Sequence, residues 1–429
     1  MKTTKFVKAV VGIGALLLAL MVAPATMAYA ATSVNVPCAG PGGGAAGLIA
    51  AINASNGSGG GKINLAPGCT YVLTVPNNSG PMTGANGLPA VTSQIVVNGN
   101  AATITRNPES PTPFRIFEVD GPGGNLTLTN LSVTGGVGPF GGGIFNDEGM
   151  VTLNNCEVAG NTGAMGGGGI ASGIGPDHPT DIGPIGTFTL NKSQVTSNSA
   201  PGGGGGGVLN HAGTLILNDS QVNGNSSLNG GGIASGTGNG GTAGSSMLIL
   251  NRTEVNDNSA SVGGDDPAAG GIANGGTAVI NSSEVNDNLA PDGLGSGILN
   301  HGTMTINRSQ VNDNSAPDGG DGGGIVNYNV NSDPPMPPIA PNSGMLRINS
   351  SQVDGNSAAD GAGGGILNDF PGQEPATLVL DHTFVDANVA AEGGGIYNIF
   401  GPVTLGSSSV SGNTPDNCEP LGSIPGCID

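Results

Sequence analysis

The stretch that decides the fold spans residues 205–225 and reads GGGVLNHAGTLILNDSQVNGN. Its glycine-rich half recurs as GGGIFN at 141–146, GGGIAS at 230–235, GSGILN at 295–300, GGGIVN at 322–327, GGGILN at 363–368 and GGGIYN at 393–398. A phrase repeated at this period is typical of a solenoid, in which no unit buries its apolar face alone and stacked neighbours form the core. The sequence therefore predicts one repetitive domain of stacked coils.

The second half of the repeat is organised around a valine, such as Val222. One asparagine stands four residues before it (Asn218), a second stands three residues after it (Asn225), and a third closes the glycine phrase (Asn210). Asparagine tolerates the left-handed backbone of tight corners, and stacked amides hydrogen-bond from coil to coil. We therefore expect a coil with an asparagine at each of three corners, whose strands pair in parallel with the next coil at about 4.8 Å.

Two short strands flank the first asparagine of each repeat. Around Asn191, the period-two alternation of a strand directs Phe188, Leu190, Ser193 and Val195 toward the interior. The predicted fold class is all-β, a parallel β-helix.

The start of the chain follows a different pattern. Residues 1–30 combine three lysines, an apolar run and a small-residue end, which is typical of a secretory signal peptide cleaved after Ala30. Residues 47–54 (GLIAAINA) have helical spacing and predict a short helix that covers the open edge of the first coil. Within the β-helix domain, 31–429, we expect an N-terminal cap and irregular coils over 31–110, regular coils over 111–413 and a C-terminal cap over 414–429.

Charge restricts the partners. The chain has 10 Lys and Arg against 30 Asp and Glu, and loss of the three leader lysines leaves 7 against 30, a formal charge of −23. Such a surface disfavours nucleic acid and anionic membranes. The apolar run of the leader is too short to span a bilayer comfortably, and no second hydrophobic span follows it. We therefore expect a secreted, extracellular protein without a membrane span.

Five cysteines in an exported chain favour disulfides. Their positions suggest pairing of Cys38 with Cys69 near the start and of Cys418 with Cys427 near the end, a hypothesis because connectivity cannot be deduced from spacing. Cys156 takes a repeat position that other repeats give to serine. This favours a small buried residue over a reactive thiol.

The pairing of the GG-[GA]-I phrase with Val-x-x-Asn, as at 222–225, resembles the repeats of polymorphic outer-membrane proteins and of exported bacterial right-handed β-helix proteins in the pectate-lyase-like superfamily. The opening is similar too, through residues 48–54, VNGN at 97–100 and FRIF at 114–117. The resemblance implies a right-handed, single-stranded parallel β-helix with a short N-terminal capping helix. For function it implies adhesion or surface display in some members and polysaccharide cleavage in others. The outer-membrane group more often has Phe in place of the Val and carries a C-terminal membrane barrel, which is not expected here.

The best candidate site is a column of carboxylates. Asp257, Asp287 and Asp313 occupy equivalent places in three consecutive repeats, so strand spacing sets their backbones about 4.8 Å apart. Stacked like charges in an oxygen-rich setting favour a cation, and Ca²⁺ fits better than a transition metal. The competing interpretation is three solvated aspartates at turn positions that favour Asp in any case. No cofactor is expected, and Ca²⁺ is the one candidate ion.

A second interpretation of the carboxylates is catalytic. Glu254 and Glu284 form an adjacent outward pair, and glycoside hydrolysis needs two carboxyl groups at a defined separation. The plainer interpretation is a solvated face, in which Arg252 and Arg308 offset the repulsion. His211 and His301 both follow a glycine phrase, but three coil steps, about 14 Å, exclude a shared metal.

Long insertions follow four of the glycine phrases, at 172–186, 235–245, 327–344 and 368–375. Insertions at one junction of a solenoid emerge on one side, which is often the binding face; neutral drift in tolerant loops is the alternative. The function most consistent with the sequence is a secreted structural or adhesive protein that binds a cell-surface or polysaccharide ligand without catalysis. A polysaccharide lyase or glycoside hydrolase on the same scaffold is the alternative.

Overall fold

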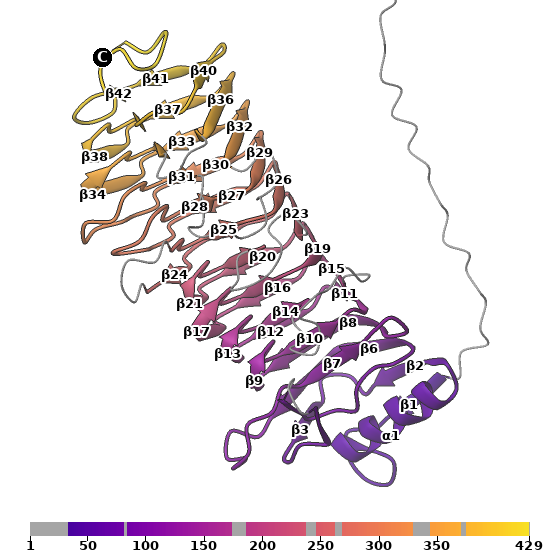
Figure 1. Ribbon diagram of the computed structural model, residues 1–429. Helices are drawn as coiled ribbons and strands as arrows, with labels where there is room; N and C mark the ends of the chain where they lie inside the picture. Colours follow the sequence, from indigo (N-terminus) through magenta and orange to yellow (C-terminus); the bar gives the residue numbers. More distant parts are fainter. Residues whose placement is uncertain are drawn as a thin grey trace, which may run out of the picture. The chain divides into compact units, whose positions relative to one another are not determined.

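Strands of successive repeats lie side by side, and each pairs in parallel with its counterpart in the preceding and following repeat (Figure 1). The computed structural model describes residues 33–80, 84–173, 186–236, 246–261, 268–328, 344–369 and 375–428. The described part belongs to one unit, Thr32–Asp429. The predicted leader and its cleavage site lie outside the described residues. The chain is thus an all-β protein with long parallel sheets, as expected for a parallel solenoid.

The longest sheet has 17 strands and contains the strands that flank the first asparagine column. Its members are β1 (Ser33–Val36), β2 (Gly60–Leu65), β3 (Thr70–Leu73), β6 (Gln94–Arg106), β8 (Asn125–Thr134), β11 (Met150–Asn154), β12 (Glu157–Ala159), β15 (Thr187–Asn191), β16 (Gln194–Thr196), β19 (Gly213–Asn218), β20 (Gln221–Asn223), β23 (Ser246–Asn251), β26 (Thr277–Asn281), β29 (Thr303–Asn307), β32 (Met345–Asn349), β36 (Thr377–Asp381) and β40 (Val403–Leu405). A five-stranded sheet prolongs the row of short strands through β27 (Glu284–Asn286), β30 (Gln310–Asn312), β33 (Gln352–Asp354), β37 (Phe384–Asp386) and β41 (Ser409–Ser411).

An 11-stranded sheet contains the residues that directly follow the glycines of each phrase. Its members are β7 (Phe117–Asp120), β10 (Ile144–Asp147), β14 (Ile170–Ser172), β18 (Val208–Asn210), β22 (Ile233–Ser235), β25 (Ile272–Asn274), β28 (Ile298–Asn300), β31 (Ile325–Tyr328), β35 (Ile366–Asp369), β39 (Ile396–Asn398) and β42 (Cys418–Glu419). The isoleucine or valine that follows the glycines is buried in each coil from Ile144 to Ile396.

Shorter sheets occupy the segment before the glycine phrase. They are formed by β9 (Val137–Phe140), β13 (Thr162–Gly166), β17 (Ser199–Gly204), β21 (Ser226–Asn229) and β24 (Ser259–Ala260), and by β34 (Ser357–Ala362) with β38 (Val389–Glu392). Near the start, β4 (Asn78–Gly80) and β5 (Gly84–Asn86) form an antiparallel pair.

The core is a stack of matching apolar residues. Phe188, Leu190, Ser193 and Val195 are each at most 1% exposed, which confirms the alternation predicted for this repeat. In-register pairing places Leu190 beside Leu153 and Leu217, so that each coil covers the apolar residues of the next. Burial therefore depends on the neighbouring coils, as expected for a solenoid.

The corners differ from the prediction by one residue. The expectation that the asparagines themselves take the left-handed conformation is wrong, because positive φ falls on their neighbours, as at Asp219 (φ 50) after Asn218 and Asp257 (φ 57) before Asn258. The asparagine side chains face their equivalents in adjacent coils and form hydrogen-bonded ladders. The asparagine amide therefore forms the ladder hydrogen bonds, while a neighbouring Gly, Asp, Asn or Ser often adopts the left-handed conformation of the corner.

The glycine phrase marks a close approach between coils. Gly205 has φ +69, and a Cβ on Gly206 would overlap the backbone oxygens of Ser226 and Gly231 in the next coil. Glycine is therefore required here for backbone packing.

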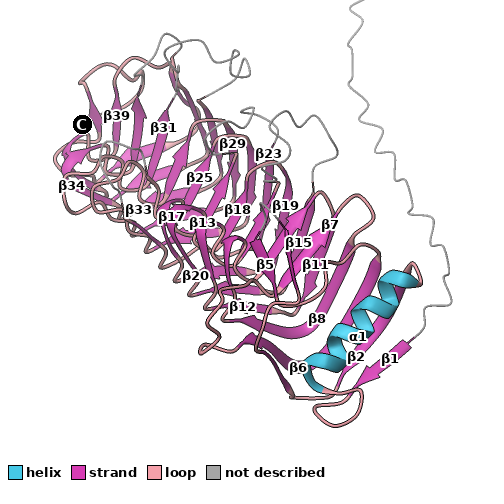
Figure 2. Ribbon diagram, turned by 60° about the horizontal axis from the view of Figure 1, so that its bottom comes forward, coloured by secondary structure: helices cyan, strands magenta, loops and turns pink. Residues whose placement is uncertain are grey.

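Both ends carry a disulfide. Cys38 bonds Cys69 and Cys418 bonds Cys427, which confirms the predicted pairs, and Cys156 is free and buried. The predicted helix at 47–54 is present as α1 (Gly44–Gly57), which lies beside β1 and β2 (Figure 2). In the described part of the chain, no helix combines the length and apolar character needed to cross a membrane.

Candidate functional site

The predicted carboxylate column lies on an exposed corner row. Asp257, Asp287 and Asp313 have φ values of 57, 56 and 54, and each precedes a buried asparagine. Equivalent corners in other repeats are held by Gly224 and Gly355, among others. The residue type at this corner therefore follows from its left-handed backbone, where Asp and Gly are favoured over most residues.

The aspartates of this row act on one another. Burial against the neighbouring coils raises the pKa of Asp287, and the charges of Asp257 and Asp313 raise it further. Burial also raises the pKa of Asp354, and Asp386 and Asp313 add to the effect. The row thus continues beyond the three predicted residues into later coils.

Sequence reasoning missed Asp354 and Asp386 because they lie one residue before the left-handed corner. They pair with each other in β33 and β37, directly after the buried valines. A signal was available in the sequence. The residue directly after the repeat's buried valine is Asn312 in one strand and becomes Asp354 in the next.

No metal centre is formed by the described residues: within them, no group of three or more His, Cys, Asp or Glu side chains is placed to hold an ion. The assignment of Ca²⁺ to Asp257, Asp287 and Asp313 stays a prediction.

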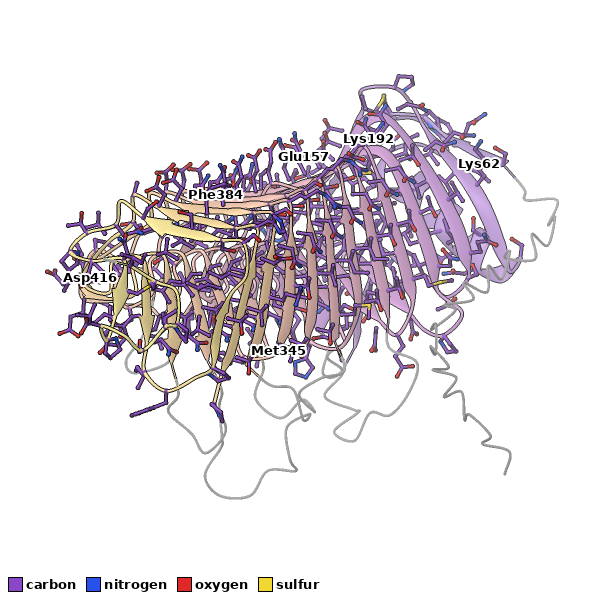
Figure 3. The ribbon with its side chains drawn as sticks, turned by 90° about the horizontal axis from the view of Figure 1, so that it is seen from above. Lys62, Glu157, Lys192, Met345, Phe384 and Asp416 are labelled. Carbon is purple, nitrogen blue, oxygen red and sulfur yellow. A yellow bond between two sulfur atoms is a disulfide. The ribbon has the colours of Figure 1, made fainter. Side chains whose placement is uncertain are left out.

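The outward Glu254 lies outside the strands and forms isolated parallel bridges with Gln221 of β20 and with the outward Glu284 of β27. Gln221 donates a hydrogen bond from Nε2 to Oε2 of Glu254 at 2.8 Å and accepts one from Gln194 at 3.1 Å. The pair is thus part of a longer exposed row of amide and carboxylate side chains, on the side that Figure 3 labels with Glu157 and Phe384.

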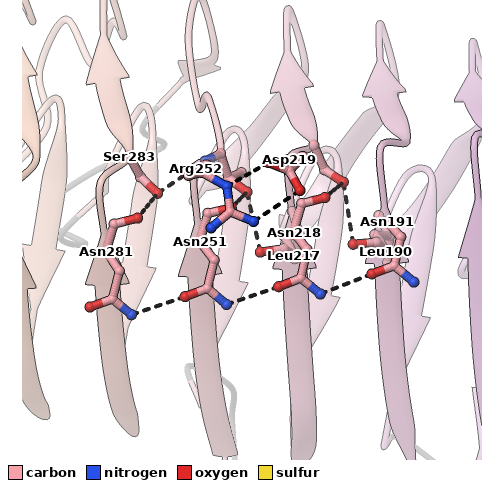
Figure 4. A network of polar contacts seen from close by, with 11 residues as sticks. Leu190, Asn191, Leu217, Asn218, Asp219, Asn251, Arg252, Asn281 and Ser283 are labelled. Carbon is pink, nitrogen blue, oxygen red and sulfur yellow. Dashed lines mark hydrogen bonds and ion pairs between the residues drawn. The ribbon is translucent and has the colours of Figure 1, made fainter.

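The arginine expected to offset this pair is engaged elsewhere. Arg252 reaches Asp219 in the preceding coil, with Nε–Oδ1 and Nη2–Oδ2 distances of 2.6 and 3.0 Å (Figure 4). This bidentate contact lowers the pKa of Asp219 and raises that of Arg252. Arg252 is thus held by Asp219, and its effect on the Glu254–Glu284 pair stays a prediction.

The first asparagine ladder runs beside this ion pair (Figure 4). Each amide Nδ2 donates to Oδ1 of the preceding coil, at 2.9 Å from Asn218 to Asn191 and from Asn251 to Asn218, and at 3.0 Å from Asn281 to Asn251. Two residues on, the Ser283 hydroxyl is buried, donates to the Asn281 carbonyl and accepts the Thr253 backbone N–H. The recurring Asn-x-Ser/Thr pattern is thus explained: the Asn side chain joins the ladder, and the Ser or Thr hydroxyl occupies the buried position two residues later.

The two histidines lie as far apart as predicted. His211 follows β18 and His301 follows β28, and two other strands, β22 and β25, separate these strands in the sheet. Burial lowers the pKa of both imidazoles, that of His301 to about 4. The two rings do not share a site.

A buried cationic cluster near the start was not predicted. Arg115 is fully buried, its Nη1 lies 3.6 Å from Oε1 of Glu118, and its guanidinium stacks over Phe145 at 4.7 Å. Burial lowers the pKa of Arg115 to about 10, with Glu118 and Asp147 opposing the shift, so the group stays charged at neutral pH. The cluster ties the β4–β5 hairpin to the first coils through the Asn86 amide, which donates to Glu118.

The four long insertions lie mostly outside the described residues. Their bounding strands are described: β14, β22, β31 and β35 belong to the 11-stranded sheet, and β15, β23, β32 and β36 to the 17-stranded sheet. All four insertions therefore connect the same two sheets.

In comparisons with protein-family models, curated proteins and solved structures, no match to this chain was found.

Proposed function

We propose that this chain is an exported right-handed parallel β-helix that serves as an extracellular structural or adhesive protein and binds a cell-surface or polysaccharide ligand without catalysis. The right hand is supported by the strong preference of connections between parallel strands for that hand. Export is supported by the leader-like residues 1–30 and by the two disulfides, which persist in oxidising compartments.

The observation that carries the adhesive role is the repetition of one exposed surface. From β16 to β33 the outward residues of the short strands are Gln194, Gln221, Glu254, Glu284, Gln310 and Gln352, paired in register. Buried asparagine ladders hold the coils beneath them in fixed register. A rigid row of similar polar groups engages a repetitive partner at many points, and linked weak contacts give high avidity.

Binding and turnover are tested together. Residues 31–429 are incubated with a panel of plant and bacterial polysaccharides, followed by co-sedimentation and by assays for new reducing ends and unsaturated products. We expect co-sedimentation with at least one polymer and no product. Turnover that is lost in Glu254→Gln or Glu284→Gln would overturn the proposal in favour of a hydrolase or lyase.

The insertions are tested separately as a binding edge. Each is replaced by the short connection that residues 301–303 provide, and both melting and adhesion are measured. Reduced adhesion at an unchanged melting temperature would place part of the ligand contact at the insertions, beside the row of Gln and Glu side chains. Full retention of adhesion contradicts the placement of the ligand at these insertions.

A further inference from the structure

The outward face of the long strands is nearly free of charge. Seven consecutive strands, β11, β15, β19, β23, β26, β29 and β32, each contribute two outward residues ahead of the asparagine ladder. The first outward position holds Met150, Thr187, Thr214, Met247, Thr277, Thr303 and Met345. The second holds Thr152, Thr189, Ile216, Ile249, Val279, Thr305 and Arg347. These residues define the long-strand face, and Arg347 is its one charged member in a chain with 30 acidic residues.

Three large apolar side chains stand out from this face at equal intervals. Met150, Met247 and Met345 are 50%, 42% and 37% exposed, and they occupy the same position of every third strand. At about 4.8 Å per strand, they lie about 14 Å apart. Methionine adapts its shape to an apolar partner, and exposed apolar side chains rimmed by polar residues are typical of interaction sites.

The order of residues on the face is nearly the same in both directions. Read from β11 to β32, the first position is Met-Thr-Thr-Met-Thr-Thr-Met, which is a palindrome centred on Met247. The second position is Thr-Thr-Ile-Ile-Val-Thr-Arg, in which Ile216 and Val279 lie at equal distances from Ile249. The ladder beside them is asparagine in all seven strands, from Asn154 to Asn349.

We infer that the long-strand face is the contact surface of a homodimer, in which a second copy packs face to face with its strand order reversed. A two-fold axis at β23 sets Met247 against its own copy and Met150 against the partner's Met345. Threonines then face threonines, and the three central aliphatic residues meet one another. A surface that binds its own copy must be self-complementary under this rotation, and the palindromic order provides that.

The area of the interface and the charges at its rim determine how strongly the dimer should associate. Seven strands of five residues cover roughly 500 Å² per copy, which is less than the ~800 Å² per partner of a standard interface. The dimer should therefore be weak and depend on concentration. At the rim, Lys192 faces Arg308, whereas Arg252, which faces its own copy, is paired with Asp219. The whole chain is strongly acidic. Salt screens such repulsion, so association should strengthen as salt rises.

The first test is sedimentation velocity of residues 31–429 from about 1 to about 200 µM at low and high salt, a range suited to a weak interface. We expect a monomer–dimer equilibrium that shifts toward dimer with salt. Met247→Lys sets two ammonium groups against each other at the axis and should weaken dimerisation about tenfold or more. The matched control is Phe384→Lys, at an exposed apolar residue on another side of the stack (58% exposed against 42% for Met247; Figure 3), which should dimerise like the parent. Melting temperatures confirm that both variants fold.

The second test fixes the direction of packing with a short bis-maleimide crosslinker. Met247→Cys should crosslink to itself. A mixture of Met150→Cys and Met345→Cys should crosslink well above either variant alone. The parent, whose free Cys156 is buried, provides the background. A parent that stays monomeric throughout, a Met247→Lys variant that dimerises normally, or Met150→Cys alone crosslinking as well as the mixture would each overturn the inference.

Discussion

At the residue scale, the corner rows place side chains of similar backbone conformation in opposite electrostatic settings. Asp287 and Asp219 both have positive φ, 56 and 50, and both are exposed. Asp287 lies between two like charges, whereas Asp219 holds Arg252. The two aspartates therefore provide a matched pair for measuring how much repulsion within the acidic row lowers the stability of the fold.

Asp287→Asn should raise the melting temperature at pH 7, and Asp219→Asn should lower it. The folded pKa of Asp287 is raised, so its carboxylate destabilises the fold above that pKa, and the penalty fades as the pH falls through it. The folded pKa of Asp219 is lowered, so its stabilisation is present above the unfolded value of about 3.9 and is lost as the pH falls through the folded pKa. Thermal melts from pH 7 to pH 2 check both signs.

Asparagine tolerates the left-handed corner, so neither variant changes the backbone requirement. Both variants should converge with the parent at the acid end of the range. A rise that persists at pH 2 for Asp287→Asn would show that the effect is not electrostatic.

At the element scale, the second asparagine ladder holds the coils in register from the inside. Asn288 donates from Nδ2 to the Val255 carbonyl at 2.8 Å and to Oδ1 of Asn314 at 2.9 Å, while its Oδ1 accepts from Nδ2 and the backbone N–H of Asn258 at 3.0 Å each. The ladder thus satisfies the polar groups that the buried corner exposes to the core. At the C-terminal end, Asn413 finds its partner in Asn417 of the cap.

Asn288→Ala should cost about 3–5 kcal/mol, because several buried groups lose their partners at about 1–3 kcal/mol each. The control is Asn307→Ala in the half-buried first ladder, where water replaces the lost bonds and the cost should be about 1 kcal/mol. Urea unfolding monitored by circular dichroism measures both. Equal losses in the two variants would contradict a special role for the buried ladder.

At the scale of the whole molecule, each coil contacts mainly its neighbours, so stability is a sum of local terms. The ends are then the weak points, and each end carries a disulfide. The C-terminal disulfide closes the segment that covers the last coil, in which Ile424 is buried against the core.

Replacing Cys418 and Cys427 by serine should speed hydrogen exchange in β39 to β42 while leaving β15 to β26 unchanged. Loss of the cap removes a partner from the last coil only, and nearest-neighbour coupling confines the effect. Hydrogen exchange with mass spectrometry resolves these segments. A uniform increase along the chain would indicate that the stack unfolds as one unit.

The sequence by itself determined the repeat, the parallel pairing and the inward residues. These follow from local rules: a side-chain period of two, a fixed phrase length, and Gly, Asn and Asp at special positions. It also located the acidic column, but not Asp354 and Asp386, because they occupy the repeat position before the column and only stacking brings that position close to Asp313.

Only the tertiary structure decided which neighbour each polar group meets. From the sequence, we expected Arg252 to act on Glu254, two residues away. In the stack its guanidinium binds Asp219 of the preceding coil. The left-handed residue proved to be the neighbour of the asparagine, because the amide must point along the stack to reach its equivalent. The sequence did not reveal that Arg115 is a buried cation, because Phe145 and Asp147, which contact or stabilise it, come from the next coil. In a solenoid the strand pattern is local, whereas the asparagine ladders and the Arg252–Asp219 pair form between coils.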